Sequence, residues 1–363
     1  MNIKFRSSQF VALLLFASLP ATTPTLRLAA DRAGVLIGAA ARPSLLQEAA
    51  YAATLSREFN MVEAEDAMKW WTIRPESGKF NFSQGDELVR FAQVHRMLVR
   101  GHCLVWDHNN PDWLAHGNFT SAQLSQILHE HITTVVKHYA GQVFAWDVVN
   151  EGFDEHGKVR DSIWYNQPGI GLAHVDKDTA YIEQAFRWAH EADPQALLFY
   201  NEGEGEGLGI KSDAIYAMLE DFKGRGVPID GVGLQMHISS FETNLQSVAT
   251  NMSRISALGL QIHITELDVP VPVKATGVWG GESAHPEDLD RQAQIYRRIV
   301  RMCLDNPSCT AIQTWGFTDK YSWIGSHSHG SQGWALPFDR DYRPKAAYNA
   351  IAEELARGRN SKR

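Results

Sequence analysis

Hydrophobic positions along the chain alternate between short continuous apolar runs and longer amphipathic stretches. The apolar runs predict eight strands, at Val35–Ala39, Phe59–Glu65, Met97–Trp106, Val143–Glu151, Ala196–Glu202, Gly231–Ile238, Gln261–Val269 and Ala311–Phe317. Helical spacing predicts eight helices, at Leu45–Phe59, Leu88–Arg96, Leu124–Tyr139, Ala180–Ala192, Ser212–Lys223, Leu245–Leu258, Leu289–Leu304 and Lys345–Ala356. Nearly continuous apolar runs are typical of parallel strands that are buried on both faces.

Strict alternation of strands and helices predicts an α/β protein in which helices connect parallel strands. A single closed (β/α)8 TIM barrel explains the alternation most simply, and the length suits one such domain. An open doubly wound sheet is the alternative. That fold usually has a glycine-rich phosphate loop after its first strand, and Gly34–Gly38 does not show the pattern. We therefore expect one barrel over residues 31–363.

The N-terminus is predicted to be an export signal within residues 1–30. Lys4 and Arg6 precede the apolar run Phe10–Leu19, which is short for a membrane span, and small residues follow it. Both Ala21 and the pair at 29–30 fit as the end of the signal. The mature protein is expected to be secreted and to have no membrane segment.

Composition narrows the class of partner. The chain has 363 residues, a net charge of −8 and no dense cluster of lysine and arginine, so nucleic acid is not an expected partner. A neutral polar ligand fits better. The chain also has 11 tryptophans, and an indole ring offers a flat apolar face that suits stacking on a sugar.

The predicted strands end in polar and aromatic residues that a core would not select. In a barrel these ends share one rim, where active sites form. One carboxylate after a strand could simply cap the next helix, but seven strands with such ends predict a shared site. The residues concerned are Glu65, Asp66, Lys69, His102, Trp106, Asn150, Glu151, Asn201, Gln235, His237, Glu266, Asp268 and Trp315.

Glu151 and Glu266 each belong to an apolar strand end and would project into the mouth of the barrel. Cleavage of a glycosidic bond needs one protonated carboxyl group and one ionised carboxylate. Their separation, about 5–5.5 Å for retention or about 6.5–9.5 Å for inversion, does not follow from sequence spacing. A bond from His237 to Glu266, with Asp268 behind the histidine, would keep Glu266 oriented and ionised. The amide of Asn150 could hold a sugar hydroxyl.

The chain resembles glycoside hydrolase family 10, the barrel xylanases, over essentially all of its length from Leu36 to Ala356. The segments that carry this resemblance are FNMVEAEDAMKW at Phe59–Trp70, GHCLVW at Gly101–Trp106, WDVVNE at Trp146–Glu151, GLQMH at Gly233–His237, ITELD at Ile264–Asp268 and TWGFTDKYSW at Thr314–Trp323.

This resemblance implies an endo-1,4-β-xylanase that retains anomeric configuration, with Glu151 as acid/base and Glu266 as nucleophile. His237 and Asp268 fall on the positions that support the nucleophile. Xylan and xylo-oligosaccharides are the implied ligands, no cofactor is implied, and we expect a monomer. Glycone subsites would be lined by Glu65, Asp66, Lys69, His102, Trp106, Asn150, Gln235, Trp315 and Trp323.

The chain departs from the family pattern at three positions near the site. Asp66 replaces the usual Asn and, when ionised, cannot donate a hydrogen bond to a sugar. Asp107 replaces the usual His and adds a carboxylate near the cleaved bond. Gly203 replaces a Tyr on the aglycone side, and the acidic segment Gly203–Gly209 is expected to be a solvated loop. Two alternatives therefore remain, a related retaining β-1,4-glycanase or aryl glycosidase and a carbohydrate binder without activity.

Cysteine and histidine positions add two expectations. Cys303 and Cys309 are close in the sequence and would form a disulfide in an oxidising compartment, which matches a bridge common in the family. Cys103 lies in an apolar run and should be a buried free thiol. His327 and His329 share one short loop, which is weak evidence for a ligand pair, and no metal is expected.

Overall fold

The apolar runs of the sequence form eight parallel strands that close into a barrel, as predicted. The computed structural model describes residues 24–172, 178–238, 241–273 and 284–360. The strands follow chain order around the barrel, and the eighth pairs with the first. They are β1 (Leu36–Ala41), β2 (Met61–Ala64), β3 (Leu98–Val105), β4 (Ala145–Asn150), β5 (Leu197–Glu202), β6 (Gly231–Leu234), β7 (Gln261–Leu267) and β9 (Cys309–Thr314).

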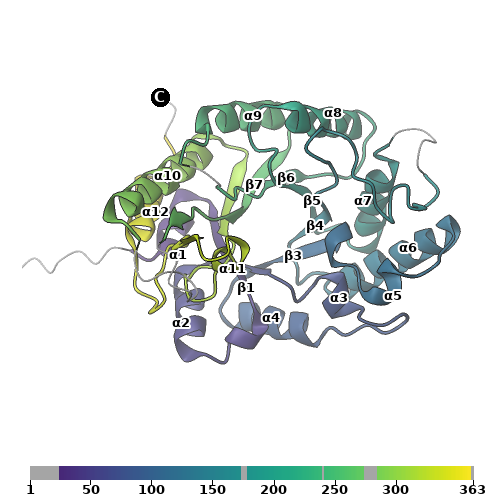
Figure 1. Cartoon of the computed structure of the whole chain (residues 1–363), viewed down its shortest axis with the longest axis horizontal. Coiled ribbons are helices and arrows are strands. Elements are labelled where there is room, and N and C mark those ends of the chain that lie inside the picture. The colour runs from purple at the N-terminus through teal and green to yellow at the C-terminus, as the bar shows by residue number, and fades with distance from the viewer. Residues whose placement is uncertain (1–23, 173–177, 239–240, 274–283, 361–363) are drawn as a thin grey trace, which may run out of the picture.

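Helices surround this ring of strands (Figure 1). A small antiparallel ladder of β8 (Val271–Pro272) and β10 (Gln332–Gly333) lies outside the barrel sheet. The longer helices are α1 (Leu26–Ala33), α2 (Ala49–Glu58), α4 (Ser83–Val94), α6 (Ser121–His138), α7 (Ala180–Ala192), α8 (Ile210–Gly224), α9 (Leu245–Ala257), α10 (Pro286–Asp305) and α12 (Ala346–Arg357). The short ones are η1 (Pro43–Leu45), α3 (Trp70–Ile73), η2 (Asp107–Asn109), α5 (Asp112–Ala115) and α11 (Ile324–His327).

Local sequence explains where these helices form and how they face the barrel. In α10, buried positions recur every three or four residues, from Gln292 through Tyr296 and Ile299 to Cys303, so one stripe faces the strands. In α6, the Thr120 side chain accepts a hydrogen bond from the backbone of Gln123, and the Gln123 side chain bonds back to Thr120. This capping box fixes the start of the helix.

Several predicted bounds differ from the observed ones by a few residues, and the end of the sixth strand shows a physical reason. The sixth strand was expected to reach Ile238, but β6 ends at Leu234, and Met236 has a φ of 61°. A positive φ interrupts the extended backbone and turns the following side chains. Only a single bridge, from His237 to Asp268, continues the pairing with the seventh strand. This turn aims His237 toward Glu266.

Helix α1 was not predicted, because most of its residues, 26–30, were assigned to the export signal. Leu26, Ala29 and Ala30 are buried, and the Leu26 backbone donates a hydrogen bond of 3.0 Å to Glu58. This segment is therefore part of the barrel wall. The predicted charged and apolar parts of the signal, at residues 4–19, lie outside the described residues. Among the helices that are described, none has the length and apolar character of a membrane span.

The cysteine predictions are confirmed. Cys303, in the last turn of α10, forms a disulfide with Cys309, the first residue of β9. Cys103 is free and buried in β3. The disulfide therefore closes the short connection that leads into the last barrel strand.

His131 is a buried histidine whose neutral form the fold requires. Its ring stacks on Trp70 with centroids 3.4 Å apart, and neither ring nitrogen has a hydrogen-bond partner among the described residues. Burial and the charge of Arg74 lower the pKa of His131 well below its ordinary value. Because its pKa is lower in the folded protein, His131 binds a proton more readily when the protein is unfolded. The free energy of unfolding therefore decreases as the pH falls below the unfolded pKa of histidine, about 6.5.

We therefore expect His131→Phe to stabilise the protein and to reduce its loss of stability between pH 7 and pH 5. Phenylalanine keeps the ring against Trp70 and removes two unpaired polar atoms, which cost about 1–3 kcal/mol each. Urea unfolding at both pH values measures the effect. Exposed His190, replaced by Phe, is the control. An unchanged difference between the two pH values in His131→Phe would show that this histidine does not govern acid stability.

Candidate functional site

The carboxyl ends of the strands surround a cleft of about 740 Å³. Most of the residues that the sequence singled out line it together, although they come from six different strands or the segments that follow them. Those that line the cleft are Lys69, His102, Trp106, Asn150, Glu151, Gln235, His237, Glu266, Trp315 and Trp323. The prediction of one shared rim is therefore consistent with the arrangement of these side chains.

Four predicted residues do not line the cleft. Asn201 and Asp268 are almost fully buried and contact the cleft residues from behind. Glu65 binds Arg42, with 2.8 Å between Oε1 and Nε. Asp66 lies beside the cleft and pairs with Lys69, with 2.9 Å between Oδ1 and Nζ. Asn201, Asp268 and Asp66 therefore each contact a residue that lines the cleft, whereas Glu65 contacts Arg42, which does not.

Glu266 is buried near the end of β7 and is held by donors on both oxygens. Asn201 donates to Oε1 at 2.8 Å, and His237 lies 3.1 Å from Oε2 through Nε2. The other ring nitrogen of His237 lies 3.0 Å from Asp268, which also accepts from Trp323 at 2.8 Å. The predicted order of carboxylate, imidazole and carboxylate is therefore present.

This environment favours the ionised form of Glu266. Burial by itself raises the pKa of a carboxyl group, but the hydrogen bond from His237, the charges of His102 and His237, and the hydrogen bond from Asn201 lower it below its ordinary value. Burial also lowers the pKa of His237, but Asp268 and Glu266 raise it well above its usual range. A protonated His237 donates from both nitrogens, which fixes the orientation of Glu266.

Glu151 occupies a different environment immediately after β4. Its backbone has a φ of 56° and donates to the carbonyl of Asn201 at 3.0 Å. Its side chain is partly exposed, and it accepts from Trp106 at 3.0 Å and from Gln235 at 2.9 Å. A positive φ in a residue other than glycine is uncommon and must be held by its surroundings. The turn directs this carboxyl group into the cleft.

A chain of amides connects the two glutamates. Asn201 donates to both Glu266 and Asn150, and Gln235 donates to both Asn150 and Glu151. Gly203 makes room for this arrangement, because a Cβ atom there would lie 2.3 Å from the Gln235 amide oxygen. Glycine at 203 therefore permits the present position of Gln235.

Lys69 brings a positive charge above two indole rings of the cleft. Its Nζ lies 5.0 Å from the Trp106 ring centroid and 5.4 Å from that of Trp315. Asp66 neutralises part of this charge through the pair described above. The Asp that replaces the usual Asn at position 66 is therefore paired with Lys69.

Asp107, the second departure from the family pattern, begins η2, and burial raises its pKa.

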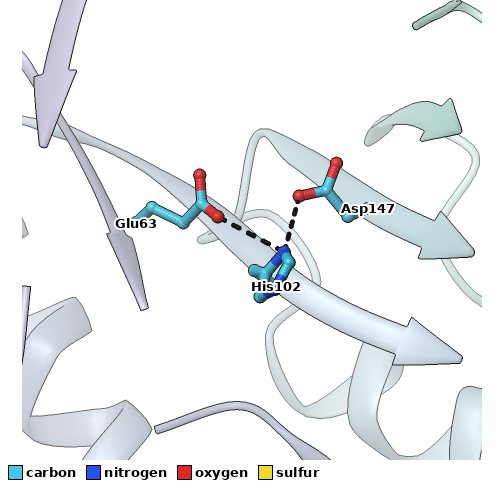
Figure 2. Close-up of side chains that lie close together, drawn as sticks. All are labelled: Glu63, His102 and Asp147. Carbon is cyan, nitrogen blue, oxygen red and sulfur yellow. Dashed lines mark hydrogen bonds and ion pairs between the residues drawn. The ribbon is translucent and has the colours of Figure 1, made fainter. Parts of the chain in front are cut away.

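Beneath the cleft, a group of fully buried charged side chains fills the barrel interior. Figure 2 shows Glu63 and Asp147 reaching toward His102 from the two neighbouring strands. The His102 Nδ1 atom lies 3.0 Å from Asp147 and 3.4 Å from Glu63. Burial lowers the pKa of His102, but the Cys103 sulfur, Asp147 and Glu63 raise it well above the ordinary value.

Arg100 is the fourth member of this group, and its positive charge disfavours a metal ion at this position. Glu63, His102 and Asp147 are close enough to one another to bind a cation. However, the Arg100 guanidinium also binds Asp147 and lies 3.6 Å from Glu63. Arg100 and His102 already pair with Asp147, and the pKa of Glu63 is raised to about 8, so a divalent cation would meet two positive groups and only one ionised carboxylate. We describe this group as the interior ion cluster.

One wall of the cleft was not found from the sequence. It contains Arg160, Glu202, Glu206 and Lys211. The Lys211 amine lies 3.0 Å from Glu202, and burial raises the Glu202 pKa to about 7. The predicted solvated loop is only partly exposed, because Glu206 turns inward and accepts from the Met236 backbone at 3.0 Å. The polar end of β5 was the available signal, but nothing in the sequence links it to the start of α8.

The arrangement combines an ionised, immobilised carboxylate with a second carboxyl group in the same cleft. An ionised carboxylate can act as a nucleophile or base, and a carboxyl group at the cleft surface can exchange protons with a bound ligand. The indole rings and amides around them suit a polar ligand with flat apolar faces.

Comparisons with known proteins agree with this chemistry. The family model of glycosyl hydrolase family 10 matches residues 25–354. The chain is 43% identical over 331 residues to endo-1,4-beta-xylanase B of Thermotoga neapolitana, covering 90% of each. Native xylanase 10B of Thermotoga maritima has 42% identity and a TM-score of 0.84, covering 92% of this chain and 98% of that one. Xylanase 10B of Thermotoga petrophila, solved with xylobiose, has 41% identity and a TM-score of 0.85, covering 93% and 98%.

Proposed function

The chain belongs to glycosyl hydrolase family 10 and is an endo-1,4-β-xylanase, and we propose that it cleaves internal xylosidic bonds by retaining double displacement. Glu266 is the proposed nucleophile and Glu151 the proposed acid/base. The observation that carries these roles is the contrast between the two carboxyl groups. Glu266 is buried and held ionised by His237 and Asn201, whereas Glu151 is partly exposed in the cleft.

In the first step, Glu151 gives its proton to the glycosidic oxygen while a Glu266 oxygen attacks the anomeric carbon. The bond to the leaving sugar breaks, and a glycosyl ester forms on Glu266. In the second step, Glu151 removes a proton from water, and the resulting attack at the anomeric carbon releases Glu266. Two inversions at the same carbon give net retention.

The other predicted residues are proposed to bind and position the sugar. Asn150 lies between the two glutamates and can bond a hydroxyl group next to the reacting carbon. Lys69, with Asp66, can bond hydroxyls of the glycone. The rings of Trp106, Trp315 and Trp323 offer stacking faces and would block a hydroxymethyl group, which favours xylose over glucose.

The alternative is a related retaining β-1,4-glycanase or aryl glycosidase with altered subsites, and Gly203 is the observation that favours it. The Gln235 amide takes the space beside Gly203, so position 203 offers no side chain that could contact a xylose leaving group. Reducing-sugar release from glucuronoxylan, barley β-glucan and carboxymethylcellulose separates these functions. Mixed short xylo-oligosaccharides, formed first as the β-anomer by NMR, support the proposal. Turnover on glucan with little on xylan would overturn it, and initial α-products would exclude retention.

Glu151→Ala is expected to affect substrates according to their leaving groups. On xylan, kcat/KM should fall by about 10³–10⁴-fold, because a sugar leaving group needs the proton. On dinitrophenyl xylobioside, whose leaving group needs no proton, kcat/KM should fall by less than about 10-fold. Steady-state rates on both substrates provide the measurement. Equal losses on the two would remove Glu151 from the role of acid.

We also propose that the protein is secreted and acts as a monomer on xylan and xylo-oligosaccharides. The disulfide between Cys303 and Cys309 supports an oxidising compartment. Packing of Leu26–Ala33 into the barrel wall supports the earlier of the two predicted signal ends, near Ala21. N-terminal sequencing of the exported protein tests this, and a first residue within α1 would contradict it.

A further inference from the structure

A second hollow of about 460 Å³ lies beside the cleft, and Asp66 is the one predicted subsite residue in its lining. It is formed by the segment that follows β1, by α3 and by the start of α4. Its lining includes Arg42, Ser44, Asp66, Trp71, Thr72 and Gln84. Asp66 lines the hollow, and Lys69, its ion-pair partner at 2.9 Å, lines the cleft. The two depressions are therefore neighbours across one ion pair.

Trp71 is the unusual residue of this hollow. The residue is 50% exposed, and every other tryptophan in the described part of the chain is at least partly buried. The preceding Trp70 is buried and donates to the carbonyl of Leu104 at 2.7 Å. Helix α3 therefore anchors itself through one indole and leaves the next on the surface. An exposed indole with polar groups around it matches a sugar ring, which has an apolar face and a rim of hydroxyls.

The guanidinium of Arg42, which lines the hollow, has donors left for a ligand. Arg42 contacts Glu65 through Nε and Nη2, and within the described residues its Nη1 makes no hydrogen bond. Its side chain is 38% exposed. The remaining N–H groups and the exposed amide of Gln84 supply donors around Trp71.

We infer that this hollow is a distal subsite that binds the xylan chain where it continues beyond Asp66 and Lys69, with a xylose ring stacked on Trp71. The inference rests on the proposed function. It follows from the Asp66–Lys69 pair, which joins the linings of hollow and cleft, since a polymer that extends from the cleft past this pair reaches the hollow. A neutral xylose unit needs the indole and the donors, and Arg42 can also accept a unit that carries a carboxylate.

The test compares substrates of different length with Trp71→Ala. On dinitrophenyl xylobioside, which is too short to reach the hollow, kcat/KM should stay within about 2-fold of the unchanged protein. On xylohexaose, kcat/KM should fall by about 3- to 10-fold, the size of one aromatic contact. With xylohexaose labelled at its reducing end, the distribution of cleavage products should change, because the binding mode that places a xylose in the hollow becomes weaker. Trp71→Phe keeps a ring and should recover part of the loss.

Leu98→Ala is the control, since Leu98 is 42% exposed at the first residue of β3, at the opposite end of the barrel. It should match the unchanged protein on both substrates. Equal losses of Trp71→Ala on both would assign Trp71 a structural role in α3, and no loss on xylohexaose would exclude the subsite. Failure of the unchanged protein to cleave xylohexaose would instead contradict the proposed function.

Discussion

Glu266→Ala is expected to lower kcat on xylan by about 10⁵-fold or more, the loss seen when a covalent nucleophile is removed. Alanine cannot form the glycosyl ester, so neither step of double displacement remains. The substitution also leaves His237 and Asn201 without the carboxylate that they hold. Binding of xylo-oligosaccharides should persist, because the surrounding subsite residues are retained. Initial rates on xylan and calorimetric binding of xylotriose provide the measurements.

Rescue by azide tests whether the loss of activity in Glu266→Ala comes from the missing nucleophile. In Glu266→Ala, a small anion can enter the vacated space and attack the anomeric carbon from the same side as the lost carboxylate. With dinitrophenyl xylobioside, azide should restore turnover and give the α-glycosyl azide, because one displacement inverts the configuration. Glu206→Ala is the matched control, since Glu206 lines the same cleft. It should retain turnover and show no response to azide. Substantial activity in Glu266→Ala without azide would assign the nucleophile elsewhere.

Arg100→Met should lower the free energy of unfolding by about 3–5 kcal/mol, the usual cost of leaving a buried charge without its partner. Arg100 is fully buried in the interior ion cluster, where it donates to Asp147 at 3.2 Å and to His263 at 2.6 Å. Methionine has a similar length but leaves Asp147 and Glu63 without their guanidinium. Burial already raises the pKa of Glu63 to about 8. Urea unfolding at neutral pH measures the loss.

Arg343→Met is the control for this measurement. Arg343 is exposed and pairs with exposed Asp341 at 3.2 Å on the protein surface. Surface ion pairs of this kind contribute about 0–1 kcal/mol, so the control should change the unfolding midpoint little. A loss in Arg100→Met no larger than in the control would show that the interior ion cluster does not depend on its guanidinium.

Much of the fold could be predicted because its determinants are local. Helix α7 was predicted with its observed bounds, and α9 to within one residue at its end. Strand β6 was predicted too long, because the turn at Met236 depends on how His237 packs against β7. Helix α1 was missed, because an apolar N-terminal segment has the same local pattern in an export signal and in a packed helix. The buried stripe of α1 becomes visible only against α12 and Glu58.

The sequence by itself determined the barrel, the pair of glutamates and the residues that share their rim. Continuous apolar runs and amphipathic stretches of period 3.6 are local properties, and parallel strands that alternate with helices present their carboxyl ends together. Only the tertiary structure decided which partners surround each carboxyl group. The ionised state of Glu266 and the ion pair of Arg100 with Asp147 depend on contacts between strands, and the exposure of Trp71 depends on which face of α3 packs against the barrel. Barrel closure and strand register set those distances, and neither can be read from residue order.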